Sequence, residues 1–129
     1  MSSDPSREER ALSADEMTFG PDGLIVAVVQ ADDTDEVLMV AYMDREALAR
    51  TLAERRAWFY SRSRARHWMK GEESGNVQDV VSVRYDCDAD ALLLRVIQRG
   101  PAGPEGAPAT GVACHTGRRS CFYRELPLG

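Results

Sequence analysis

The sequence lacks any apolar run long enough to cross a membrane, and residues 1–10 lack the apolar core of a secretory signal. Cysteine is scarce, because the 129 residues include only three, an odd number that does not suit a disulfide framework. We therefore expect a cytoplasmic protein with no membrane segment. The net charge of −5 at pH 7 also argues against general affinity for nucleic acid.

What the sequence does contain is typical of one folded domain. Hydrophobic residues make up 43% of the chain and charged residues 29%, and the length allows one hydrophobic core but not two. Residues 1–18 are polar and show no periodicity. We expect them to form a mobile N-terminal tail, followed by a single domain over residues 19–129.

The pattern of apolar residues predicts an α+β fold. Residues 24–30 and 36–42 are β-prone and are joined by a polar turn, which predicts a hairpin. Asp44 can cap a helix whose apolar stripe includes Leu48 and Leu52. Further strands are expected at residues 57–60, 77–85, 91–98 and 121–124, and the Pro- and Gly-rich residues 100–111 are expected to form a loop. The result is a compact, mainly antiparallel sheet with one clear helix.

All three cysteines lie in two segments that are suited to binding metal. Cys87 lies among Asp86, Asp88 and Asp90, and Cys114 and Cys121 enclose a short polar segment. Thiolates prefer a soft metal such as zinc, and clustered carboxylates prefer a hard one such as magnesium. A solvated acidic turn would explain the three aspartates equally well. The wide spacing of the last two cysteines is by itself a weak signal.

Three thiolates without an obvious fourth protein ligand are typical of a catalytic zinc site, in which the open position holds water. If residues 86–90 are extended, Cys87 points opposite to the neighbouring aspartates. One subunit would then place its zinc and its magnesium on opposite sides. We therefore expect a symmetric dimer in which Cys87 of one subunit meets Cys114 and Cys121 of the other.

Basic residues gather at two places, residues 62–70 and residues 118–119. Guanidinium groups and hydroxyls are suited to binding phosphate, although solvated strand edges often carry the same residues. Trp68 could stack on a base or belong to the core. The candidate substrate-binding residues are Ser61, Arg62, Ser63, Arg64, Trp68, Lys70, Ser74, Arg118 and Arg119. Beside a hydrolytic metal, these anion-binding groups indicate a phosphorylated substrate.

Five segments carry a family resemblance: residues 38–43 (LMVAYM), 60–64 (YSRSR), 68–76 (WMKGEESGN), 86–90 (DCDAD) and 114–121 (CHTGRRSC). In this order they resemble the phosphoribosyl-AMP cyclohydrolase family of histidine biosynthesis, over about residues 23–124. The resemblance implies that zinc-activated water opens the N1–C6 bond of the purine of 1-(5-phosphoribosyl)-AMP, giving the formimino-carboxamide ribonucleotide. It also implies an intertwined homodimer, with Zn²⁺ at Cys87 of one subunit and Cys114 and Cys121 of the other, and Mg²⁺ at Asp86, Asp88 and Asp90.

His115 is the candidate catalytic residue, because it adjoins a predicted zinc ligand and can carry a proton near neutral pH. An orienting role beside the metal is the alternative. Compared with the family pattern, Asp44 stands where asparagine is usual, His67 replaces an aliphatic residue, and residues 100–111 form a longer loop. Because the sequence ends at Gly129, we expect a stand-alone cyclohydrolase domain.

Three other functions would require different sequence features. A zinc deaminase would carry H-x-E and P-C-x-x-C motifs, which this sequence lacks. A redox-active thiol protein is disfavoured because there is no C-x-x-C motif. A non-catalytic zinc module would have a fourth protein ligand and would tolerate substitution of Asp88.

Overall fold

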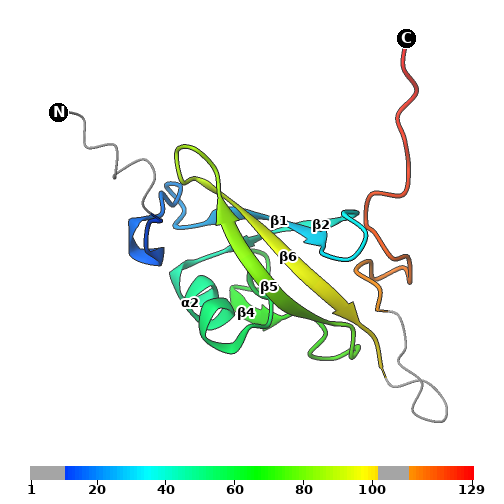
Figure 1. Ribbon diagram of the computed structural model, residues 1–129, viewed down its shortest axis with the longest axis horizontal. Coiled ribbons are helices and arrows are strands. Elements are labelled where there is room, and N and C mark those ends of the chain that lie inside the picture. Colours follow the sequence, from blue (N-terminus) through cyan, green and yellow to red (C-terminus); the bar gives the residue numbers. More distant parts are fainter. Residues whose placement is uncertain (1–10, 102–110) are drawn as a thin grey trace.

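The computed structural model describes residues 11–101 and 111–129 of the chain. Within these residues, β1 (Ile25–Ala31) and β2 (Val37–Met43) form the antiparallel hairpin that the sequence predicts. β1 also pairs in parallel with β6 (Ala91–Arg99), which in turn pairs antiparallel with β5 (Val77–Tyr85). The four-stranded sheet therefore has the order β2-β1-β6-β5 and is mixed (Figure 1). β3 (Trp58–Ser61) and β4 (Arg66–Met69) form a second, two-stranded antiparallel sheet.

The α-helix α2 (Arg45–Glu54) begins where the sequence predicts it. The Asp44 carboxylate accepts a hydrogen bond from the Ala47 N–H at 2.8 Å, so it satisfies one of the free donors of the first turn. Leu48 is buried as expected, but Leu52 is 47% exposed, and Thr51 takes its place against the core. The predicted α+β class, with one α-helix in the described residues and mostly antiparallel pairing, is confirmed.

The core lies on one side of the four-stranded sheet, where α2 and the β3–β4 hairpin cover it (Figure 1). Alternate residues of β1 and β6 point into it, as the period of two in a strand requires. Phe59 of β3 is fully buried among them. The buried hydrophobic residues of β1 and β6 are Ile25, Ala27, Val29, Ala31, Leu92, Leu94 and Val96. No helix in the described part of the chain is both long enough and apolar enough to cross a membrane.

Three sequence predictions about the fold need correction. Residues 121–124 form no strand, because the only backbone bond that fastens them to the sheet edge runs from Cys121 N–H to the Leu38 carbonyl. β4 was not predicted, because its charged residues hide its alternation. The predicted tail extends too far: residues 1–10 lie outside the described residues, but Ala14–Glu16 form a short 3-10 helix and Met17 is buried in the core. Of the predicted loop at 100–111, residues 102–110 also lie outside the described residues.

Candidate active site

The three aspartates of the predicted magnesium site do come together. Asp86, Asp88 and Asp90 lie in the turn between β5 and β6, and their ligand atoms are all within 4.8 Å of one another. The assumption of an extended chain is wrong, because the backbone turns here and Ala89 has a positive φ of 59°. The Asp86 carboxylate accepts hydrogen bonds from the N–H groups of Asp90, at 3.0 Å, and Ala91, at 3.3 Å. The turn itself gathers the carboxylates.

The three carboxylates in this turn carry like charges and repel one another. Side-chain hydrogen bonds to Asp88 and Asp86, together with repulsion from both, raise the pKa of Asp90 to about 6. Although desolvation opposes the change, hydrogen bonds from the backbone and from Asp90 and Asp88 lower the pKa of Asp86. Asp90 therefore keeps its proton up to a higher pH than an isolated aspartate does. Three exposed carboxylates that share a proton are a donor set that fits a hard divalent cation in its place.

The second candidate metal site lies in the segment that we call the cysteine loop, residues 111–121. The Cys114 and Cys121 thiols lie close enough for each to affect the pKa of the other, and the Thr116 hydroxyl lies 2.9 Å from Cys114 Sγ. Hydrogen bonds from Thr116 lower the pKa of Cys114, whereas burial raises the pKa of Cys121. Two neighbouring thiols, one of them with a lowered pKa, are a donor pair that fits a soft metal such as zinc.

Cys87 lies far from this pair. It is exposed in the turn between β5 and β6, whereas the cysteine loop begins beside the other end of that hairpin (Figure 1). A Cβ on Gly111 would lie only 2.7 Å from the backbone carbon of Arg99, the last residue of β6. β5 and β6 have nine residues each, so the hairpin is roughly 30 Å long. Within the described residues of one chain, the three cysteines do not form a metal site.

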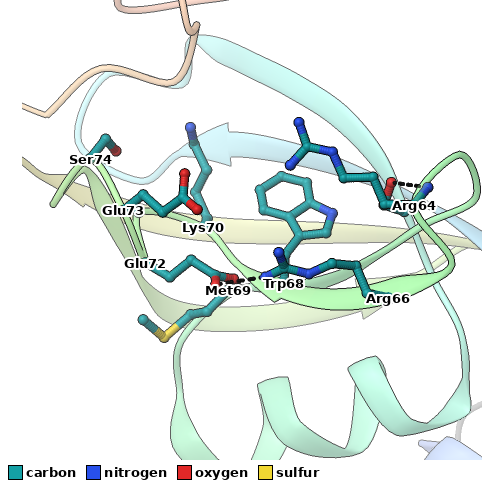
Figure 2. A pocket seen from close by; sticks show the side chains of 10 residues that line it. Arg64, Arg66, Trp68, Met69, Lys70, Glu72, Glu73 and Ser74 are labelled. Atoms are coloured by element: carbon teal, nitrogen blue, oxygen red, sulfur yellow. Dashed lines mark hydrogen bonds and ion pairs between the residues drawn. The ribbon is translucent and has the colours of Figure 1, made fainter.

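A pocket of about 360 Å³ lies between the β3–β4 turn and the residues that follow β4. Its lining includes five of the predicted substrate-binding residues: Ser61, Arg64, Trp68, Lys70 and Ser74. In Figure 2 the Trp68 indole lies between the Lys70 and Arg64 side chains. Gly71 closes the turn after β4, with φ of +88° and a missing Cβ that would lie 2.4 Å from Asn76. No other residue fits there without moving the backbone.

Lys70 connects this pocket to the cysteine loop. Its ammonium group lies near both Cys121 and Cys114, and burial lowers the pKa of Lys70 against the opposing effect of these two thiols. A positive charge at this place favours thiolates and attracts an anion into the pocket. Lys70 thus belongs to the pocket lining and also feels the two thiols of the cysteine loop.

Comparison with known proteins identifies the site's family. The family model for phosphoribosyl-AMP cyclohydrolase matches residues 39–123. A phosphoribosyl-AMP cyclohydrolase of Bordetella parapertussis is 54% identical, over 86% of this chain and 75% of the relative. Another, of Geobacter sulfurreducens, is 56% identical over 78% of this chain and 73% of the relative. The chain belongs to the phosphoribosyl-AMP cyclohydrolase family. It is accordingly an enzyme, a hydrolase, and the resemblance predicted from the five motifs is confirmed.

Every predicted site residue falls within the part of the chain that matches the cyclohydrolase family, but four predicted substrate-binding residues lie outside the pocket lining. The guanidinium of Arg62 lies over the Tyr42 ring and that of Arg118 over the Tyr123 ring. Ser63 hydrogen-bonds to Ser61, and Arg119 forms ion pairs with two carboxylates. His115 is exposed next to Cys114, and its catalytic role stays a prediction.

Sequence reasoning missed three charged residues of the pocket lining, Arg66, Glu72 and Glu73. Arg66 and Glu72 form an ion pair of 2.8 Å across the pocket mouth, and Glu72 also accepts a hydrogen bond from the Met69 N–H (Figure 2). A strand assignment for residues 66–69 would have found Arg66, because alternation puts it on the same side as Trp68.

Proposed function

We propose that this cyclohydrolase opens the adenine ring of 1-(5-phosphoribosyl)-AMP by hydrolysis of the N1–C6 bond, a cytoplasmic step of histidine biosynthesis. One observation carries the proposal: a pocket lined with basic groups includes Lys70, whose pKa responds to the neighbouring thiols of Cys114 and Cys121. The substrate has two phosphates and a purine, so it needs cationic groups and a flat apolar surface close to a hydrolytic centre.

The enzyme is proposed to be an intertwined homodimer with two zinc sites, each formed by Cys114 and Cys121 of one chain and Cys87 of the partner subunit. The roughly 30 Å hairpin that separates Cys87 from the thiol pair within one chain supports this arrangement. The edge strand β2 also exposes apolar side chains, Val37 at 41%, Val40 at 42% and Tyr42 at 38%, that a second copy could cover. Zinc held by three thiolates supplies a Lewis acid with an open position that makes water more acidic.

Magnesium is proposed to bind Asp86, Asp88 and Asp90. The convergence of their ligand atoms within 4.8 Å and the raised pKa of Asp90 support this, because a cation would relieve their mutual repulsion. Since Cys87 lies in the same turn, dimerisation would bring these carboxylates near the zinc site of the partner. Each centre would then contain both metals.

The pocket residues are proposed to bind and orient the substrate. Arg64, Lys70 and Ser74 offer charge and hydrogen bonds to phosphate, with Ser61 at the same mouth. Trp68 offers an indole face to the purine, and it is fixed from behind by the Phe59 ring, whose centre lies 5.0 Å from its own. The exposed residues Arg62, Ser63 and Arg118 are proposed as further contacts at the rim.

His115 is proposed to move a proton at the hydrolytic centre or to orient a group beside the metal. It directly follows Cys114 and is exposed, so it can reach a bound substrate and exchange protons with solvent. An effect of His115→Asn on the rate alone would indicate proton transfer. An effect of the same substitution on zinc affinity would indicate the orienting role.

Zinc content and turnover of cysteine variants test the proposed function. Cys87→Ser and Cys121→Ser should each lose zinc and turnover of phosphoribosyl-AMP together. Ala53→Ser, which adds a hydroxyl on the exposed side of α2, is the control and should keep both. A fully active Cys87→Ser would remove Cys87 from the site.

A further inference from the structure

The cysteine loop is held to the β1–β2 turn by one arginine. Arg119 Nε lies 2.7 Å from Glu36 Oε1, and a terminal nitrogen of the same guanidinium lies 3.3 Å from Asp33 Oδ1. The Arg119 side chain is 28% exposed, so water competes less here than at a fully exposed pair. Two carboxylates from one turn thus engage two sides of the guanidinium fork.

Hydrogen bonds connect the segment around Arg119 to both cysteines and to β2. The Arg119 carbonyl accepts from the Ala113 N–H at 3.0 Å, and the Arg118 carbonyl accepts from the Cys114 N–H at 3.1 Å. On the other side of Arg119, the Ser120 hydroxyl donates to the Val37 carbonyl and the Cys121 N–H donates to the Leu38 carbonyl, each at 2.7 Å. The segment before Cys114 and the segment that ends in Cys121 are therefore fastened to each other and to the start of β2.

We propose that Arg119, held by Glu36 and Asp33, is a positioning residue that sets the spacing of Cys114 and Cys121 before zinc binds. The inference rests on the proposed function in one respect, that zinc occupies this thiol pair. A loop of eight residues between and including two ligands would otherwise sample many separations, and the metal would have to order it on binding. The proposal gives Arg119 a different role from the predicted phosphate contact, because the Arg119 guanidinium already has two carboxylate partners.

The test measures zinc affinity in the absence of substrate, by competition with a chromophoric chelator. Glu36→Gln and Arg119→Gln should each weaken zinc binding by roughly tenfold or more, the usual effect of losing a group that orients metal ligands. Arg119→Lys, which keeps the charge but not the fork, should lose less. The double variant Glu36→Gln, Arg119→Gln should bind zinc no more weakly than Arg119→Gln alone, because Glu36 and Arg119 act as one unit.

Asp35→Asn is the matched control. Asp35 lies in the same turn and pairs with Arg95 at 2.6 Å, so its substitution removes an ion pair from the turn without touching Arg119. Its zinc affinity should equal that of the wild type, and thermal melting should show all variants folded.

Three results would overturn the inference. Unchanged zinc affinity in Glu36→Gln and Arg119→Gln, while the wild type binds zinc, would refute the positioning role and leave the proposed function standing. A raised KM in Arg119→Gln with unchanged zinc affinity would identify Arg119 as a phosphate contact. Failure of the wild type to bind zinc would overturn the proposed function together with this inference.

Discussion

A heterodimer made from two inactive variants should recover half of the activity. Cys87→Ser and Cys121→Ser each remove one thiol from both zinc sites of a homodimer. In a heterodimer of the two, one site receives Cys87 from one chain and an intact Cys114–Cys121 pair from the other. The second site carries both substitutions. One complete site out of two predicts about half of the wild-type zinc content and turnover per dimer.

Separate affinity tags on the two chains allow the heterodimer to be co-expressed and purified away from both parents. The matched control is a heterodimer of Cys114→Ser with Cys121→Ser, in which each chain has lost one thiol of the same pair and neither site is complete. That control should have no activity. If the Cys87→Ser and Cys121→Ser heterodimer is no more active than the control, the reasoning is refuted, because each zinc site would then be formed within one chain.

Three further predictions concern a buried hydroxyl of α2, the pKa of Asp90 in the acidic turn, and Lys70 in the pocket. Thr51→Val should lower the free energy of unfolding by about 1–3 kcal/mol, because the buried Thr51 hydroxyl accepts a hydrogen bond from the Trp58 N–H at 3.0 Å. Urea unfolding measures this change, and a change within error would refute the role. Asp88→Ala should lower the pKa of Asp90 from about 6, since Asp88 is the main cause of the shift. Because that pKa lies above the reference value of 3.8, the metal-free protein should become less stable as pH rises from about 4 to 6, and the variant should lose less stability. Carboxyl NMR titration measures the pKa of Asp90, and melting curves measure the stability. An unchanged pKa of Asp90 in the variant would contradict the account. Lys70→Met should reduce kcat/KM by roughly tenfold or more through the loss of a charge-assisted contact, and unchanged steady-state kinetics would place Lys70 outside the site.

Local sequence patterns predicted the elements that depend on neighbouring residues. The β1–β2 hairpin, the Asp44 cap and the β5–β6 hairpin follow from alternation, capping chemistry and a polar turn, all readable within about ten residues. β4 was missed because none of its four residues is fully buried, so no apolar alternation marks the strand. The strand predicted at 121–124 failed because β-prone residues form a strand only where a partner edge gives them a ladder.

The convergence of the three aspartates was predictable from residue type, whereas its geometry was not. The aspartates converge through a turn rather than through strand alternation, so the alternation of side chains gives no reason to expect a dimer. The length of the β5–β6 hairpin supports the same dimer for a different reason. The pairing of Arg119 with Glu36 joins residues 83 positions apart, and no local pattern indicates such a contact.

The most direct test of the account is the ultraviolet absorbance change as phosphoribosyl-AMP is opened. It should be followed with the purified protein before chelation, after chelation and after zinc is restored. We predict turnover that disappears with the chelator and returns with zinc. No turnover from a folded, zinc-loaded protein would contradict the proposed reaction.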